Sequence, residues 1–390
     1  MSNDVRIGVV GTGFIASNFM RNLERQAGFA VGRILTRRPT SSLNGFPESA
    51  VTNSLDELVR STDAIVECSG DPIWATEVAR AAVEADLPMV TMNTEFHITT
   101  GSAFVEHGLI SEAEGDQPGC QAALHEDAVA MGFEPVAYGN MKGFLNTDPT
   151  PEDMRFWGEK QGISLPMVTS FTDGTKVQAE QILVANHFGA GLAREGMLGA
   201  EVEGIEEAAR LLATEATAAG RPIADFVVDR GLPHGVFLVC RHDERQSAAL
   251  DYYKLGAGPF YTIVKNNIFV HLEILKTVRR MVETRSVLLD NSRTPELSLA
   301  GVAKRDLIAG DRIDSAIGSF QVRGHSIEIG VRPDHVPIGL LRDVVIHEPV
   351  GRGEIITFDH IELPDSLALD LWRDDILPRS LEPAPSGVSR

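Results

Sequence analysis

The feature that most constrains the fold is a glycine-rich turn near the N-terminus, Gly11-Thr12-Gly13-Phe14-Ile15-Ala16. Residues 5–10 before it are apolar enough for a buried strand, and residues 15–25 carry apolar side chains at helical spacing. Between a strand and a helix, the first glycine permits a tight bend, the second lets backbone N–H groups approach a pyrophosphate, and the small Ala16 allows close helix packing. The alternative is an ordinary strand-to-helix turn. The residues expected to bind a dinucleotide are Gly11, Thr12, Gly13, Phe14 and Ile15.

The pattern of strand followed by helix continues through the first quarter of the chain. Apolar runs near 29–36, 64–68 and 88–92 are typical of buried strands, and helical patterns lie near 54–60 and 74–85. Repeated strand and helix predict an α/β fold with a doubly wound parallel sheet of the Rossmann type.

Changes in pattern along the chain predict its division into parts. After residue 150 the alternation loosens: we expect a charged helix at 151–162, a short strand at 166–172 and a long helix at 176–190. Short runs separated by glycine turns follow from residue 295, and the end of the chain is rich in Pro and Ser. The expected parts are a nucleotide-binding domain at 1–150, a central substrate domain at 151–294, a small β-rich domain at 295–365 and a partly disordered tail at 366–390.

Composition excludes several classes of partner. The 390 residues carry a formal charge of −20, which repels nucleic acid and anionic lipid. The cysteines Cys68, Cys120 and Cys240 form no CxxC pair and no disulfide framework. No run is long enough to span a bilayer, and the N-terminus lacks a secretory pattern. We expect a cytoplasmic protein with a small-molecule substrate, no nucleic-acid or membrane partner, and a homodimeric state by base rate.

The end of the second predicted strand bears on the choice of cofactor. An NAD-binding fold places Asp or Glu there to accept from the ribose hydroxyls, but this chain has Thr36-Arg37-Arg38. Two guanidinium groups suit a 2′-phosphate, so the sequence favours NADP over NAD, unless Arg37 and Arg38 are merely solvated. Ser69 and Gly70, after the strand at 64–68, are expected to cover the dinucleotide or else to form a plain loop.

Candidate catalytic groups lie at predicted strand and helix ends. Lys142 follows an apolar run, at a position where α/β enzymes present reactive groups, although it could equally be a loop lysine. Asp173 and Lys176 lie at a helix start, and Glu180, four residues on, shares a face with Lys176. The alternative is that Asp173 caps the helix while Lys176 pairs with Glu180 on the surface.

Other polar residues are candidates for holding substrate. Asn93 and Glu95 follow the strand at 88–92, on the side expected for the nicotinamide, and Arg230 could hold an anionic group. No metal site is predicted, because consecutive residues such as 125–127 point in different directions on a helix.

Longer strings resemble a known group of enzymes. Met92-Asn93-Thr94-Glu95, Met131-Gly132-Phe133-Glu134 and Ser170-Phe171-Thr172-Asp173-Gly174-Thr175-Lys176 resemble the homoserine-dehydrogenase-like oxidoreductases, and more closely their branch similar to deoxyxylulose-phosphate reductoisomerase (DXR-like). The string Ala303-Lys304-Arg305-Asp306-Leu307 and the later Gly353-Glu354-Ile355-Ile356 resemble a SAF domain. The chain departs from the branch pattern after Tyr261.

The resemblance implies a Rossmann domain, a central α/β (α+β) catalytic domain and NAD(P)H chemistry on a carbonyl or hydroxyl group. It also aligns Lys142 with the lysine that homoserine dehydrogenases place near the cofactor. The expected substrate is small and polar, a sugar-like compound, hydroxy acid or semialdehyde, with or without a phosphate group. The alternatives are a metal-dependent reductoisomerase, a homoserine dehydrogenase, and a non-catalytic regulatory protein that binds NAD(P) or a sugar.

Overall fold

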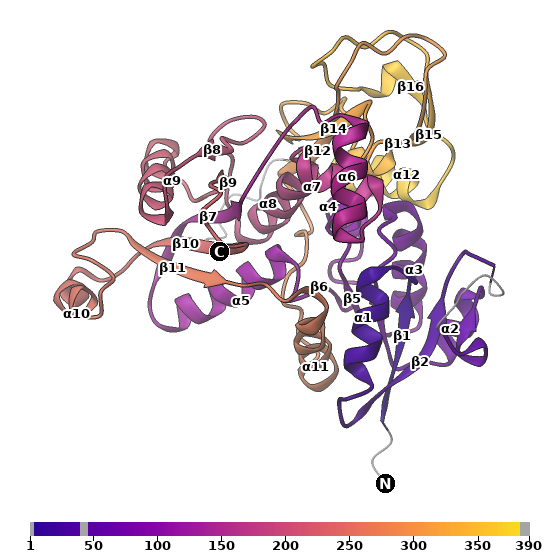
Figure 1. Ribbon diagram of the computed structural model, residues 1–390, viewed down its shortest axis with the longest axis horizontal. Helices are drawn as coiled ribbons and strands as arrows, with labels where there is room; N and C mark the ends of the chain where they lie inside the picture. The colour runs from indigo at the N-terminus through magenta and orange to yellow at the C-terminus, as the bar shows by residue number, and fades with distance from the viewer. Residues whose placement is uncertain (1–3, 40–45, 383–390) are drawn as a thin grey trace.

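The computed structural model describes residues 4–39 and 46–382, and Figure 1 shows their arrangement. A parallel sheet at the lower right holds the N-terminal part, a mixed sheet extends to the left, and a small β-rich module lies above the first sheet. No helix among the described residues is long and apolar enough to cross a membrane.

The first sheet is parallel and has six strands in the order β3-β2-β1-β4-β5-β6, so the predicted α/β fold is confirmed. Alternate residues of its first strand, Ile7 and Val9, are fully buried against the helices that cover the sheet. Its strands are β1 (Val5–Val10), β2 (Phe29–Leu35), β3 (Val51–Thr52), β4 (Ala64–Glu67), β5 (Met89–Thr91) and β6 (Ile110–Glu112), and its helices are α1 (Phe14–Leu23), α2 (Leu55–Arg60), α3 (Pro72–Glu84) and α4 (Thr94–Thr100).

The second sheet has the order β11-β10-β7-β9-β8 and separates two apolar layers. Ala137 and Phe237 face α9, whereas their neighbours Tyr138 and Leu238 face the other layer, which holds α8. The elements are β7 (Glu134–Lys142), β8 (Ala200–Glu201), β9 (Ile223–Val228), β10 (Gly235–Arg241), β11 (Tyr261–Asn266), α5 (Gln117–Ala130), α8 (Thr175–Phe188), α9 (Ile205–Ala219) and α10 (Ser247–Tyr252). The helix α11 (Ile274–Thr284) packs on β4 and β5 of the first sheet. Because β7 pairs with β9 and β10, this unit begins before the predicted boundary at residue 150.

The short strand expected at 166–172 is wrong, because these residues form the helix α7 (Leu165–Thr172). Pro166 stands in its first turn, where its missing N–H costs nothing. The hydroxyls of Thr169 and Thr172 donate to backbone carbonyls four residues earlier, which satisfies them within the helix. The charged helix before it agrees with expectation, as α6 (Pro151–Gln161), and so does α8 after it.

The β-rich module is built from β12 (Leu297–Ala303), β13 (Arg312–Ser315), β14 (Val322–Glu328), β15 (Arg342–Ile346) and β16 (Ile361–Glu362). These strands pair as β12-β14 and β13-β15-β16. The expected tail differs in its first part: α12 (Leu367–Leu371), a π-helical turn (Trp372–Ile376) and α13 (Leu377–Leu381) follow the module, with Trp372 fully buried. α12 packs on α3 and α4 of the first unit, and residues 383–390 lie outside the described part of the chain.

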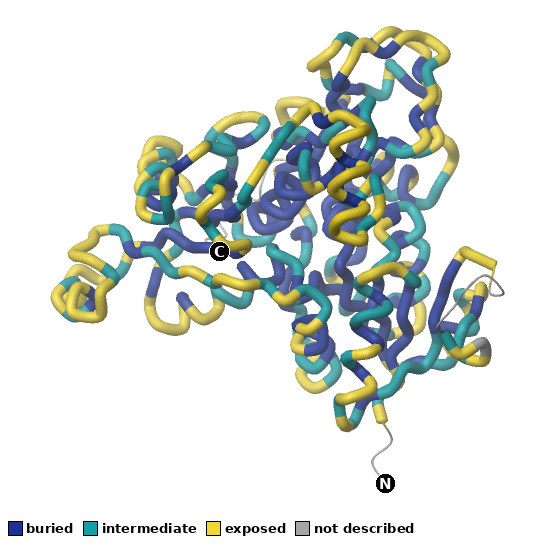
Figure 2. Tube along the Cα trace, in the orientation of Figure 1, coloured by how far each residue is buried: buried dark blue, intermediate teal, exposed yellow. Residues whose placement is uncertain are grey.

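The helix α8 lies at the centre of the molecule. All its residues from Thr175 to Asn186 are buried, and Figure 2 shows this segment among the most enclosed parts of the trace. It contacts α4 of the first unit, β7 and β9 of the second sheet, and β12 and β14 of the C-terminal module. One helix therefore connects all three parts.

A buried ion pair ties the module to the start of α8. Lys304 Nζ lies 2.6 Å from Asp173 Oδ2, and the side chains are 2% and 0% exposed. Asp173 also accepts from the backbone N–H of Thr175. Burial raises the pKa of the Asp173 carboxyl, and the charge of Lys304 opposes this effect.

We expect Lys304→Met to lower the free energy of unfolding by about 3–5 kcal/mol, because it leaves a buried carboxylate without its cation. Urea denaturation at pH 7, followed by intrinsic fluorescence, measures the change. The matched control is Arg305→Met, whose exposed pair with Asp311 should contribute less than about 1 kcal/mol. Equal stability of the two variants would contradict the structural importance of the buried pair.

Candidate functional site

The glycine turn has the geometry that a bound pyrophosphate requires. Gly11 has φ +110°, and a Cβ there would stand 2.8 Å from the carbonyl oxygen of Cys68. Gly13 precedes α1, and no atom lies within 4 Å of the place where its Cβ would be. Ala16 is fully buried under the sheet. The turn therefore presents free backbone N–H groups and the N-terminus of α1 to open space.

The loop after β4 lies beside this turn and is fixed by a buried acid. Glu67 accepts from the backbone N–H of Ser69 at 2.6 Å and from the Thr91 hydroxyl at 2.9 Å. Burial raises the pKa of Glu67 despite these hydrogen bonds. Gly70 is open where a Cβ would be and has φ +67°. The loop and the turn therefore form two neighbouring walls, which are open where Gly13 and Gly70 lack a side chain.

A cavity of about 1020 Å³ extends from these walls into the centre of the molecule. Its lining comes from the carboxyl ends of β4 and β5, where open α/β sheets bind ligands, from the end of β7, from α6, α7 and α8, and from the C-terminal module. The polar or charged residues that line it include Ser69, Asn93, Glu95, Asp116, Gln117, Lys142, Lys176, Glu180, His234 and Arg342.

Lys176 is held by acceptors from two other helices. Its Nζ lies 2.9 Å from Asp116 Oδ2, 2.9 Å from the Thr94 hydroxyl and 3.5 Å from Glu95 Oε2. Burial lowers the pKa of Lys176, but the surrounding carboxylates outweigh this effect and raise it well above the usual value. Lys176 therefore stays positively charged at neutral pH.

Lys142, the last residue of β7, belongs to a second network. Its Nζ donates to Gln117 Oε1 at 2.7 Å and lies 3.3 Å from Glu180 Oε2, which also accepts from the Asn140 amide at 2.8 Å. The amide of Gln117 donates to Asn140 at 2.6 Å and closes the ring of contacts. Burial raises the pKa of Glu180, although Lys142 lowers it. This carboxyl therefore retains its proton to higher pH than an exposed one.

Several predicted site residues meet at this cavity. Lys142, Lys176, Asn93, Glu95 and Glu180 line it together with Ile15, Ser69 and Gly70. Lys176 does not form the predicted surface pair with Glu180, because both are buried and have other partners. Gly11, Thr12, Gly13 and Phe14 lie in the adjoining turn.

Four other predicted site residues lie outside the lining of this cavity. Asp173 is fully buried against Lys304. Arg230 is exposed and packs over the Phe144 ring at 6.0 Å, outside the cavity lining. Arg37 pairs with Asp71 at 2.6 Å rather than being solvated alone, while Arg38 is exposed beside it.

Sequence reasoning missed the acceptors that hold the lysines. Asp116 caps α5 and is followed by Gln117 and a proline, which is a recognisable helix start, but nothing local links it to Lys176. Glu112 was also missed: its Oε2 lies 3.8 Å from His97 Nε2, and both side chains are fully buried. Burial raises the pKa of the Glu112 carboxyl and lowers that of His97 to about 4.

Two family profiles match successive parts of the chain. Residues 11–105 match the NAD binding domain of homoserine dehydrogenase, and residues 115–274 match the catalytic domain of oxidoreductase DRL. A part similar to an NAD-binding domain is thus followed by a part similar to an oxidoreductase catalytic domain. The first match contains the glycine turn, and the second contains Lys142, Lys176 and Glu180.

Similar solved structures include other oxidoreductases. UDP-N-acetylglucosamine 3-dehydrogenase from Acidithiobacillus ferrooxidans is 12% identical over 74% of this chain and 92% of its own, with a TM-score of 0.42. Dihydrodipicolinate reductase from Paenisporosarcina sp. TG-14 is 12% identical over 73% of this chain and 97% of its own, with a TM-score of 0.37. No curated protein matches the sequence.

The residues present fit a nicotinamide dinucleotide. Gly13 and Gly70 leave open space on either side of the path from the turn to the cavity. Asn93, which is buried and lines the cavity, has a side-chain nitrogen without a hydrogen-bond partner. Among residues 4–39 and 46–382, no group of three or more His, Cys, Asp or Glu side chains is placed to hold a metal ion.

We expect Gly13→Val to weaken NADPH binding at least tenfold, because the branched side chain would occupy the space that the pyrophosphate needs. Since that space is open, the free energy of unfolding should stay within about 0.5 kcal/mol of the original. Fluorescence titration and thermal unfolding measure the two quantities. Gly330→Val is the control, because this exposed glycine is equally open but lies far along the chain in the C-terminal module. Unchanged affinity in Gly13→Val would show that the turn does not bind the cofactor.

Proposed function

We propose that the protein is an NAD(P)H-dependent reductase or dehydrogenase that transfers hydride between the nicotinamide and the carbonyl or hydroxyl carbon of a small polar substrate. The observation that carries this proposal is the single cavity that connects the glycine turn and its adjoining loop with Lys142, Lys176 and Glu180. A bound nicotinamide supplies or accepts the hydride. The protein's own side chains bind the substrate, stabilise the charge that develops on its oxygen and transfer the proton.

The two lysines have different roles in this proposal. Lys176, permanently charged and fixed by Asp116, stabilises the negative charge that develops on the carbonyl oxygen during reduction. Glu180, whose pKa is raised, donates the proton that this oxygen takes up, and Lys142 with Asn140 orients the carboxyl. In the oxidative direction, Glu180 accepts the proton from the substrate hydroxyl. The charge and the proton are thus balanced in both directions.

The cavity lining supports a polar substrate. Carboxylates, amides and lysines line it and offer both donors and acceptors to hydroxyl or carboxyl groups. A sugar-like compound, a hydroxy acid or a semialdehyde, with or without a phosphate group, has matching groups. Arg37 and Arg38 at the end of β2 favour NADP, because no acid stands there for the ribose hydroxyls of NAD.

Fluorescence titration of the purified protein with NADPH and NADH is the first test. Binding of either dinucleotide at micromolar concentration supports the proposal, and binding of neither contradicts it. Turnover is then measured on a panel of sugar-like and semialdehyde carbonyl compounds, with and without Mg²⁺ or Mn²⁺. A strict metal requirement with a rearranged product would identify a reductoisomerase instead. Tight cofactor binding with no turnover on any compound would favour a regulatory protein.

We expect Lys176→Gln to lower the rate of carbonyl reduction by about 10²–10³-fold, as removal of an oxyanion-stabilising group does. NADPH affinity should change by less than about threefold, since this side chain lies at the substrate end of the cavity. Steady-state kinetics and fluorescence titration separate these effects, with the exposed Lys254→Gln as control. A normal rate in Lys176→Gln would remove this lysine from the mechanism.

The pH dependence of reduction should report Glu180. The protonated carboxyl is the active form in reduction, so the rate should be highest at low pH and fall as pH rises through the raised pKa of Glu180. Glu180→Gln should lower the rate by about 10²-fold or more and abolish that fall. Rates between pH 5 and 9 are compared with those of the exposed control Glu134→Gln. Persistence of the same pH profile in Glu180→Gln would exclude it as the proton donor.

A further inference from the structure

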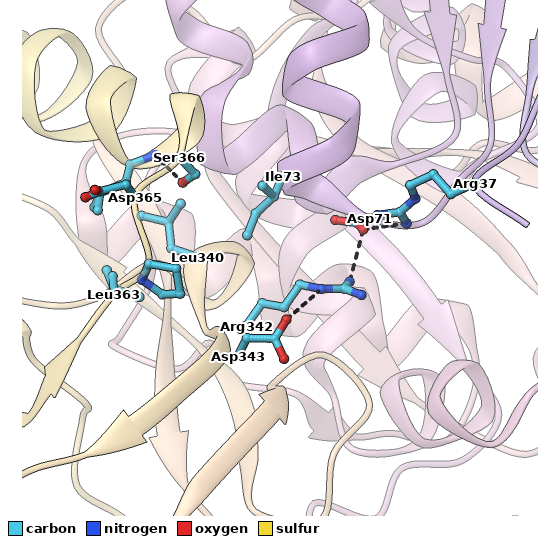
Figure 3. A pocket seen from close by; sticks show the side chains of 11 residues that line it. Arg37, Asp71, Ile73, Leu340, Arg342, Asp343, Leu363, Asp365 and Ser366 are labelled. Carbon is cyan, nitrogen blue, oxygen red and sulfur yellow. Dashed lines mark hydrogen bonds and ion pairs between the residues drawn. The ribbon is translucent and has the colours of Figure 1, made fainter. Parts of the chain in front are cut away.

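Two arginines from opposite ends of the sequence meet at one carboxylate beside the nucleotide-binding edge. Asp71 Oδ2 lies 2.6 Å from Arg37 Nη2, at the end of β2, and 3.1 Å from Arg342 Nη1, on β15 of the C-terminal module. Figure 3 shows the two guanidinium groups approaching Asp71 from different elements. The Asp71 side chain is only 5% exposed, so its position is fixed by the surrounding structure.

The contacts of Asp71 limit what it can do for a cofactor. Its Oδ1 accepts from the backbone N–H of Trp74 at 3.2 Å, and its Oδ2 is shared by two guanidinium groups. A carboxylate that selects NAD must have oxygen atoms available to accept from the ribose hydroxyls. Asp71 is already used in orienting arginines, so it is poorly suited to that task.

Arg37 and Arg342 bring two positive charges to Asp71, and Asp343 Oδ2 lies 3.8 Å from Arg342 Nε. Two guanidinium ions share one carboxylate, and the side chains of Arg37 and Arg342 remain 51% and 40% exposed. The Arg37 guanidinium also lies over the Trp74 ring, 5.5 Å from its centre, which further fixes its orientation. Each guanidinium has several N–H donors, so both retain free donors for an anion. In a chain of net charge −20, such a pair is an unusual local attraction for phosphate.

A second cavity, of about 220 Å³, adjoins the arginines. Ile73 from α3 and Leu340 and Leu363 from the module give it an apolar wall suited to a base. Figure 3 shows the arginines at one end and Asp365 with Ser366 at the other, while Asp343 lies beside Arg342. Asp343 is also paired with Arg312 at 3.2 Å, which offsets its charge.

Arg342 also lines the large cavity that contains Lys142 and Lys176. The same arginine therefore borders both cavities, and the loop from Ser69 to Pro72 lies between them. A dinucleotide with its pyrophosphate on the glycine turn would have its nicotinamide in the large cavity and its adenosine toward the small one. Residues of the C-terminal module line both cavities and would border such a cofactor.

We propose that Arg342 is a cofactor-specificity residue, which binds the 2′-phosphate of NADP together with Arg37. This inference rests on the proposed function and assigns part of the cofactor site to the C-terminal module. Asp71 acts as a positioning residue that holds the two guanidinium groups side by side before the phosphate arrives. The phosphate then connects the first unit with the module.

The test compares the two dinucleotides in Arg342→Met, which keeps the length of the side chain and removes its charge. The original protein should bind NADPH at least tenfold more tightly than NADH. In Arg342→Met the NADPH affinity should fall at least tenfold and the NADH affinity should stay within about twofold. Arg342→Lys should retain part of the preference, because it keeps the charge without the planar fork. Arg332→Met, at an exposed arginine of the same module, is the matched control.

Competition with adenosine 2′,5′-bisphosphate and adenosine 5′-monophosphate tests the phosphate directly. The bisphosphate should compete better with NADPH in the original protein, and this advantage should vanish in Arg342→Met. An equal loss of NADPH and NADH affinity would show that Arg342 only holds the module in place, and would overturn the inference while leaving the proposed function intact. A preference for NADH in the original protein would likewise overturn the inference and leave the proposed function intact. Failure to bind either dinucleotide would overturn both.

Discussion

The burial of a charged helix is the constraint on which the rest of this structure depends. α8 carries Lys176 and Glu180 in the interior, where an unpaired ion costs several kcal/mol. The chain therefore has to bring partners to both residues from elsewhere. Asp116 meets Lys176, while Asn140 and Lys142 meet Glu180. These partners come from β7 and from the start of α5, which follows the edge strand β6 of the first sheet. The contacts that pair the charges of α8 therefore also join the second sheet to the edge of the first.

This requirement also fixes the distance between the two lysines. Asp116 and Gln117 are consecutive residues at the start of α5, and each contacts a different lysine. The lysines can therefore move relative to each other only if the first turn of α5 moves as well. The site is preorganised by the same contacts that make the buried charges tolerable, which is the arrangement that electrostatic stabilisation of a developing charge needs.

The features that could be predicted from the sequence are those that depend on interactions between residues close together in the chain. The strand, turn and helix around Gly11 and Gly13 depend on neighbouring residues, and their prediction is confirmed by the fold. Lys142 and Lys176 were placed correctly at a strand end and a helix start, yet their pairing with Gln117 and Asp116 is non-local. The partner of Asp173 was missed for the same reason, since Lys304 lies 131 residues away. The strand predicted at 166–172 is wrong for a different reason. Thr and Val favour strands, but here a proline in the first turn and hydroxyl contacts with the backbone favour a helix.

The return of the final helices to the first unit has a consequence for biosynthesis. Trp372 and Ile376 belong to the same apolar core as Val78 of α3 and Phe96 of α4. Because translation runs from the N-terminus, that surface of the first unit stays uncovered until the segment that packs on it has been made. The part of the chain made first is thus completed by a segment made almost three hundred residues later, which delays its final packing.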